Sequence, residues 1–73
     1  MASRLTGRVA EYDEQAGFGT IEDSDGRRYW FHCTAISDGT RTIPVGAAVT
    51  FAVVAGHLGR WEAAEVGVQS NPL

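Results

Sequence analysis

The feature that most constrains the fold of this chain is a pair of short strand-like runs joined by an acidic turn. Residues 17–21 alternate small and apolar side chains, residues 23–26 read Asp-Ser-Asp-Gly, and residues 29–32 form a second run rich in aromatic side chains. Turn-forming residues between two such runs are typical of a β-hairpin. The sequence therefore predicts that the two runs pair as antiparallel strands.

Pairing of these runs gathers aromatic rings on one face. Side chains two positions apart on a strand share a face, so Phe18 stands with Thr20, and Trp30 stands with His32. Soluble proteins seldom leave a group of flat rings in water. We expect this face either to be covered by other protein or to stack a flat ligand.

The remainder of the chain shows further strand patterns and no helical period. Its 73 residues make one small domain, which buries only about 60% of the surface of the unfolded chain. Gly7, at the centre of the first strand, predicts a bend or a bulge, and residues 34–36 predict one tight helical turn. Five short strands without helices fit a small closed barrel. We expect these strands at residues 5–9, 17–21, 29–32, 47–55 and 61–68.

From about Thr6 to Val66 the chain resembles the bacterial cold-shock domain in the order and in nearly all the spacings of five short motifs. Ala16–Ile21 stands where the family has its first ribonucleoprotein motif, and Tyr29–His32 stands where it has the second. The resemblance implies an all-β fold, a five-stranded antiparallel OB-type Greek-key barrel. It also implies a single domain over residues 1–68, followed by a flexible C-terminal tail, residues 69–73.

In this family, the rings that match Phe18, Trp30 and His32 stack successive bases of single-stranded DNA or RNA. The resemblance therefore implies a nucleic-acid-binding protein that works by base stacking, as an RNA chaperone or a regulator of transcription or translation. Arginines near the rings would contact phosphates. Arg60 and Trp61 would compensate in part for family binding residues that this chain lacks. The candidate site residues are Tyr12, Phe18, Arg28, Trp30, His32, Arg41, Arg60 and Trp61.

Several candidates also have a plainer interpretation. Phe18 could be an ordinary core residue, although Phe18 and Ile21 are three residues apart on a strand and should face opposite sides. His32 alone could be a solvated surface histidine. Trp30 is predicted to face outward because its neighbours on both sides supply the inward face. Tyr12 could add an edge contact to a ligand or simply pack on the barrel.

The chain departs from the family pattern at five positions that the family uses for binding. Lysines are replaced by Ala10 and Ala16, a tryptophan by Glu11, and further aromatic residues by Thr20 and Cys33. A stacked base is worth about 1 to 3 kcal/mol, so losing three or four rings would cost roughly 3 to 6 kcal/mol. We expect weak binding.

The charge allows a second interpretation. Six arginines and no lysine stand against nine acidic residues, for a net charge of −3, whereas a nucleic-acid binder usually shows a basic stripe. Charges more than about 8 Å apart are largely screened, so the position of each charge matters more for nucleic-acid binding than the net charge does. The alternative is a degenerate barrel that uses the Trp30 face for a protein partner or for self-association. Either way we expect a monomer or a weak dimer.

The sequence gives little support for catalysis, a metal or a cofactor. His32 and Cys33 are adjacent on a strand and should point to opposite faces, and no spacing of histidines and cysteines is typical of a metal site. Carboxylates at residues 22–25 are better explained as caps of backbone amides in a turn. We expect neither an enzyme nor a small-molecule substrate. The lone cysteine and the lack of an apolar leader or membrane span favour a cytoplasmic protein.

Overall fold

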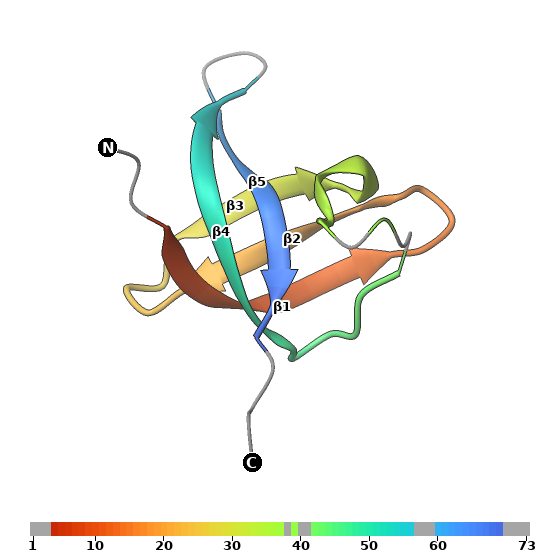
Figure 1. The fold of residues 1–73 in the computed structure, drawn as a ribbon, viewed down its shortest axis with the longest axis horizontal. Helices are drawn as coiled ribbons and strands as arrows, with labels where there is room; N and C mark the ends of the chain where they lie inside the picture. Colours follow the sequence, from red (N-terminus) through yellow and green to blue (C-terminus); the bar gives the residue numbers. More distant parts are fainter. Residues whose placement is uncertain (1–3, 38, 40–41, 57–59, 70–73) are drawn as a thin grey trace.

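The structure, a computed structural model, describes residues 4–37, 39, 42–56 and 60–69. Five strands close into a barrel in the order β1-β2-β3-β5-β4 (Figure 1). β4 and β5 cross over the sheet formed by β1, β2 and β3 (Figure 1). The strands are β1 (Leu5–Asp13), β2 (Phe18–Asp23), β3 (Arg28–His32), β4 (Ala48–Ala55) and β5 (Trp61–Val68), and a short 3₁₀ helix, η1 (Cys33–Ala35), follows β3.

Antiparallel pairing holds throughout the sheet except where the barrel closes. There β3 meets β5 in parallel, with Trp30 opposite Glu62. The predicted all-β barrel and the predicted hairpin are confirmed, and β4 and β5 fall within one residue of the expected ranges. β1 runs four residues further than expected, to Asp13, and the helical turn begins one residue earlier than expected.

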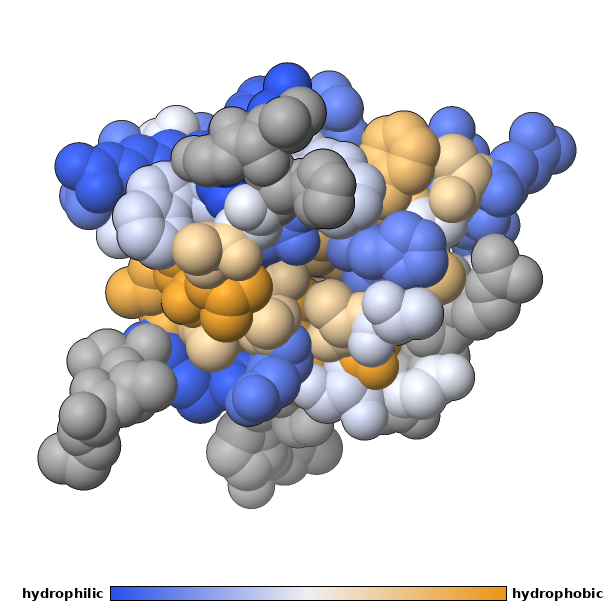
Figure 2. All heavy atoms as spheres, turned by 90° about the horizontal axis from the view of Figure 1, so that it is seen from above, coloured by the Kyte–Doolittle hydropathy of each residue, from blue (hydrophilic) through white to orange (hydrophobic). Residues whose placement is uncertain are grey.

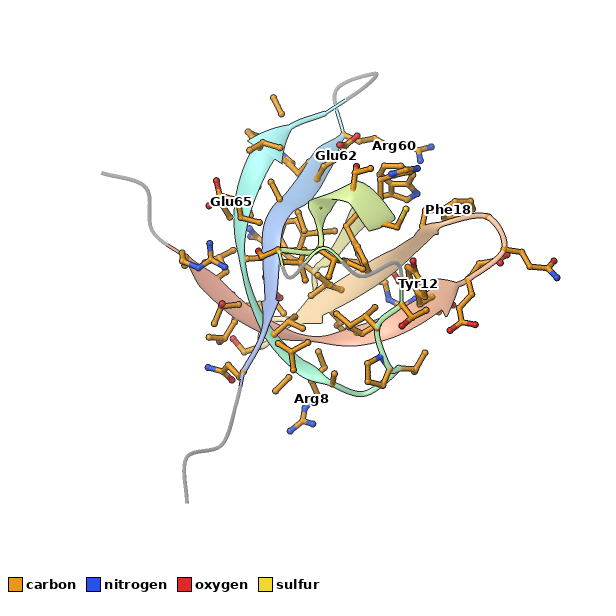
Figure 3. The ribbon with its side chains drawn as sticks, turned by 45° about the vertical axis from the view of Figure 1, so that its right-hand side comes forward. Arg8, Tyr12, Phe18, Arg60, Glu62 and Glu65 are labelled. Carbon is orange, nitrogen blue, oxygen red and sulfur yellow. The ribbon has the colours of Figure 1, made fainter. Side chains whose placement is uncertain are left out.

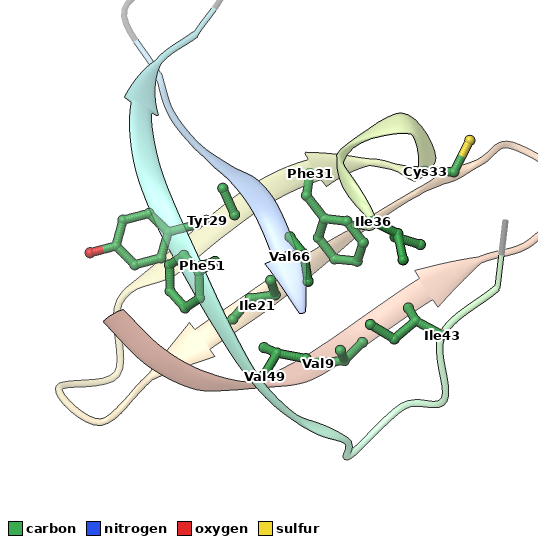
Figure 4. Packing of buried hydrophobic residues seen from close by; sticks show 11 residues of the cluster. Val9, Ile21, Tyr29, Phe31, Cys33, Ile36, Ile43, Val49, Phe51 and Val66 are labelled. Atoms are coloured by element: carbon green, nitrogen blue, oxygen red, sulfur yellow. The ribbon is translucent and has the colours of Figure 1, made fainter. Parts of the chain in front are cut away.

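The core forms from the inward side chains of all five strands (Figure 4). Alternation sends every second residue inward, as Val49 and Phe51 show on β4. On β5 the two buried residues, Ala63 and Val66, are three positions apart, where the register with β4 shifts. This packing fixes the register, because a slip by one residue would turn the apolar side chains to the surface. The buried residues are Val9, Ile21, Tyr29, Phe31, Cys33, Ile36, Ile43, Val49, Phe51, Ala63 and Val66.

The irregularity in β1 lies at Ala10 rather than at Gly7. The register with β2 shifts between Val9 and Glu11, which leaves Ala10 as the extra residue of a bulge. Gly7 has a different role, because a Cβ atom there would lie 2.6 Å from the carbonyl oxygen of Glu22. The bend predicted at Gly7 is therefore wrong in position, and the glycine permits close approach of β1 to β2.

The acidic turn between β2 and β3 is organised by Asp23. Its Oδ1 accepts hydrogen bonds from the backbone N–H groups of Asp25 and Arg27, both at 2.9 Å, and its Oδ2 accepts one from the Tyr29 hydroxyl at 3.1 Å. Desolvation tends to raise the pKa of Asp23, but the amides of Arg27 and Asp25 and the Tyr29 hydroxyl outweigh it and hold the pKa below its ordinary value. The interpretation of these carboxylates as backbone caps is confirmed for Asp23.

The last described residue, Gln69, follows the end of β5. Its backbone N–H donates to the carbonyl of Ala48 at 2.8 Å. The domain boundary after residue 68 stays a prediction. Residues 70–73 lie outside the described residues. Within the described part of the chain, no helix is long and apolar enough to cross a membrane.

Candidate nucleic-acid interface

The hairpin of β2 and β3 presents its outer face to solvent as a ladder of cross-strand pairs. Phe18 lies opposite His32, and Thr20 lies opposite Trp30. The residues that alternate with them, Gly19 and Ile21 on β2 and Tyr29 and Phe31 on β3, are buried. The placement predicted for these side chains from alternation is confirmed.

The rings of Phe18, Trp30 and His32 form a continuous array on this face, which we call the platform. The ring centroids of Phe18 and Trp30 are 5.7 Å apart with 29° between the planes, and those of Trp30 and His32 are 6.2 Å apart with 39° between the planes. Phe18 is 40% exposed and is therefore not a core residue. His32 is exposed, whereas Trp30 is half-buried. Trp30 faces outward as predicted, but its two ring neighbours cover part of the indole.

His32 is held in place by the start of η1. Its Nδ1 accepts a hydrogen bond from the backbone N–H of Thr34 at 3.2 Å and lies 3.0 Å from the Thr34 hydroxyl. It also lies 3.8 Å from Cys33 Sγ, so the prediction that these two side chains point apart is wrong. The strand ends at His32, and the chain then turns into a helix, where strand alternation no longer applies. Cys33 itself is buried and offers no surface to a ligand.

Tyr12 lies on β1 and is half-buried. Its ring stacks on the buried ring of Phe31, with centroids 5.7 Å apart and 12° between the planes, and it packs against the core. The ring thus packs on the barrel, and the edge contact of Tyr12 to a ligand stays a prediction.

Arg28 lies beside the platform, but two carboxylates flank it. Its guanidinium nitrogens are 3.8 Å from Glu11 Oε2 and 3.6 Å from Glu22 Oε1. All three side chains are well exposed to solvent. Such surface ion pairs contribute little to stability, but they reduce the positive charge that Arg28 adds to this face.

A groove of about 830 Å³ opens on the other side of Trp30, and we call it the side groove. It is lined by both tryptophans, Trp30 and Trp61, and by Arg27, Arg28 and Arg60. The structure thus brings Arg28, Arg60 and Trp61 close to Trp30, as the sequence predicted. Arg27 was missed, although its position next to Arg28 at the start of a strand was a usable signal.

The remaining candidate, Arg41, lies outside the described residues. Arg60, Phe18 and Tyr12 project on one side of the ribbon, while Arg8 lies apart from them (Figure 3). On the face viewed in Figure 2, apolar areas alternate with polar ones. Among the described residues, no group of three or more side chains is placed to hold a metal ion.

Comparison with known proteins assigns the family. The model of the "Cold-shock" DNA-binding domain matches residues 5–69. Cold shock-like protein CspD of Bacillus cereus is 38% identical over 55 residues, which make up 74% of this chain and 83% of the relative. Cold shock protein 1 of Arabidopsis thaliana is 36% identical over 67 residues, which make up 89% of this chain and 22% of the relative.

The barrel is also similar to a solved structure. Drosophila Unr CSD456 matches with a TM-score of 0.78 and 27% sequence identity, over 94% of this chain and 28% of that one. This chain therefore spans less than a third of both the plant and the fly protein. With the family model matching all five strands, the chain belongs to the cold-shock DNA-binding domain family.

Proposed function

We propose that this protein binds single-stranded RNA or DNA by stacking bases on the platform, without catalysis, as an RNA chaperone or a regulator of transcription or translation. The observation that carries the proposal is the continuous array of Phe18, Trp30 and His32. Aromatic rings on an open face stack bases with little regard to sequence, because every base has a π-face. Family membership supports the same function.

The surroundings of the platform argue for weak binding. Glu11 and Thr20 lie beside Trp30 in one row across β1, β2 and β3, where larger rings would extend the stacking surface. The buried Cys33 adds no ring either. With each missing base contact worth about 1 to 3 kcal/mol, the protein should hold single strands loosely.

The test is a titration at low salt, where electrostatic attraction to phosphates is strongest. An oligothymidylate of about eight nucleotides falls within the roughly 4 to 16 nucleotides that an OB fold covers. It should quench the tryptophan fluorescence, whereas a duplex of the same length should quench it much less. Equal responses to both forms, or no binding of the single strand, would contradict the proposal.

A second candidate function is recognition of a protein partner or self-association through the Trp30 face. The flanking of Arg28 by Glu11 and Glu22 favours it, because this pairing lowers the attraction of the face for phosphates. Sedimentation velocity separates the two functions. Concentration-dependent dimers that Trp30→Ala abolishes, in a protein that binds no oligonucleotide, would support the second.

A further inference from the structure

The side groove has an exposed tryptophan that the platform does not use. Trp61, the first residue of β5, is 62% exposed. Among the described residues its ring belongs to none of the close aromatic pairs. Large exposed rings at the edge of an apolar groove are typical of binding sites. Trp61 therefore offers an open ring in the groove that Trp30, a member of the platform, also lines.

The charge of the side groove complements a polyanion. Three arginines line it, and no carboxylate does. Arg28 is shared with Glu11 and Glu22, and the charge of Arg27 helps to lower the pKa of the nearby Asp23, although neither Arg27 nor Arg60 forms an ion pair within 4 Å with any described residue. In a chain with a net charge of −3, this is a local concentration of positive charge. Arginine next to an open aromatic ring suits a phosphate and its base.

The lining of the side groove is apolar and comes from distant parts of the chain. Leu5 at the start of β1, Tyr29 on β3 and Val53 on β4 contribute to it. Thr20 lines the same groove, and its Oγ1 is buried without a hydrogen-bond partner among the described residues. A flat, partly apolar group with polar edges, such as a base, fits this lining.

We propose that the side groove is a second base-binding subsite, in which a nucleotide stacks on Trp61 while Arg60 and Arg27 hold its phosphate. This proposal rests on the proposed function, because the strand reaches the groove from the platform. Trp30 borders both surfaces, so a strand that stacks on Trp30 can continue past it to Trp61. Glu11 and Thr20 stand where rings would extend the platform. The subsite makes up for part of this missing stacking surface.

The proposal predicts a dependence on strand length that the platform alone would not give. We would measure the affinity of the wild type and of Trp61→Ala for labelled oligothymidylates of about three and about eight nucleotides, below and within the usual site size of an OB fold. Trp61→Ala should weaken binding of the longer strand roughly 5- to 150-fold, as the loss of one stacked base implies. Binding of the shorter strand should stay unchanged.

Two further variants control this experiment. Val68→Ala removes another exposed apolar side chain, 48% exposed at the far end of β5, and should change neither affinity. Trp61→Phe keeps a ring and should retain most of the affinity, which separates loss of stacking from loss of fold. A Trp61→Ala protein that binds the longer strand as well as the wild type, or that weakens both lengths equally, would overturn the subsite. Failure of the wild type to bind either strand would instead reject the proposed function.

Discussion

At the scale of single residues, the charges next to the platform oppose the binding that its rings favour. Arg28, which is two residues before Trp30 on β3, lies between Glu11 and Glu22. These two carboxylates largely neutralise its positive charge. Glu11 also lies in the row of Thr20 and Trp30, where its carboxylate would repel a phosphate. We therefore expect Glu11 to lower the affinity for a single strand in two ways, by neutralising Arg28 and by repelling phosphate.

Replacing this carboxylate should strengthen binding. We expect Glu11→Gln to raise the affinity for a single strand about 1.4- to 5-fold at low salt, because an exposed charge contact is worth about 0.2 to 1 kcal/mol. The gain should disappear at high salt as screening removes the repulsion. Glu65→Gln is the matched control, since Glu65 pairs with Arg4 and does not neighbour Arg28. An equal gain in both variants would mean that net charge, not position, is responsible.

Asp23 makes a pH-dependent contribution to stability. Its pKa in the folded state lies below the ordinary value of about 3.9, so its stabilising effect is complete above about pH 4 to 5 and is lost as the pH falls through the folded pKa. Asp23→Asn should lower the midpoint of thermal unfolding at neutral pH. The difference from the wild type should shrink in acid.

Thermal melts between neutral pH and about pH 3 check this expectation. Asp25→Asn is the control, because it removes the same charge from the same turn, whereas Asp23 accepts the hydrogen bonds of the turn. If the two variants behave alike, the hydrogen bonds of Asp23 do not explain the acid sensitivity.

At the scale of elements, the hairpin and the closed barrel were predictable from the sequence, whereas the residues that meet across the closure were not. Alternation alone places Phe18, Trp30 and His32 on one face of β2 and β3, because both strands and their turn are local in sequence. The side groove requires Leu5, Val53 and Trp61 to meet, and these residues come from β1, β4 and β5. Their meeting depends on how the sheet closes, which no local pattern encodes.

The same distinction explains the errors in detail. The bulge at Ala10 rather than Gly7 reflects the pairing of β1 with two partners, β2 on one edge and β4 on the other. The contact between His32 and Cys33 depends on where β3 ends. One error concerns a position just after the pairing of β1 with β4 ends, and the other concerns the end of β3.

Restoring the missing rings of the platform should strengthen binding. Glu11→Trp combined with Thr20→Phe adds rings in the row of Trp30 and removes one carboxylate, so we expect at least a roughly tenfold gain in affinity. The fold should persist, because Glu11 is exposed and Thr20 is only half-buried, with an unsatisfied hydroxyl that the change removes. A well-folded double variant that binds no better would show that the stacking geometry of the family does not apply to this chain.

At the scale of the whole molecule, the net charge of −3 opposes association with a polyanion. The described arginines near the rings are confined to the side groove, so few phosphates can be neutralised. Weak binding with a shallow dependence on salt follows from this distribution.

The expected weak binding can be stated as a salt dependence of the affinity. With about three phosphates neutralised, the slope of log affinity against log salt should be near −2, at about −0.7 per phosphate for a single strand. The dissociation constant for a short pyrimidine-rich strand should be micromolar or weaker. Titrations at several salt concentrations measure both quantities. Nanomolar binding at about 0.15 M salt would mean that most of the binding surface lies elsewhere.

The central claim is that Trp30 stacks a base, and one comparison tests it most directly. We would measure the affinity of the wild type and of Trp30→Ala for a labelled oligothymidylate of about eight nucleotides, together with their thermal unfolding. The affinity should fall by about 1 to 3 kcal/mol, while the half-buried ring should cost less stability than the roughly 3 to 5 kcal/mol expected for the core variant Phe51→Ala. Val68→Ala should change neither quantity appreciably. A large loss of stability with unchanged affinity would contradict the claim and make Trp30 a structural residue.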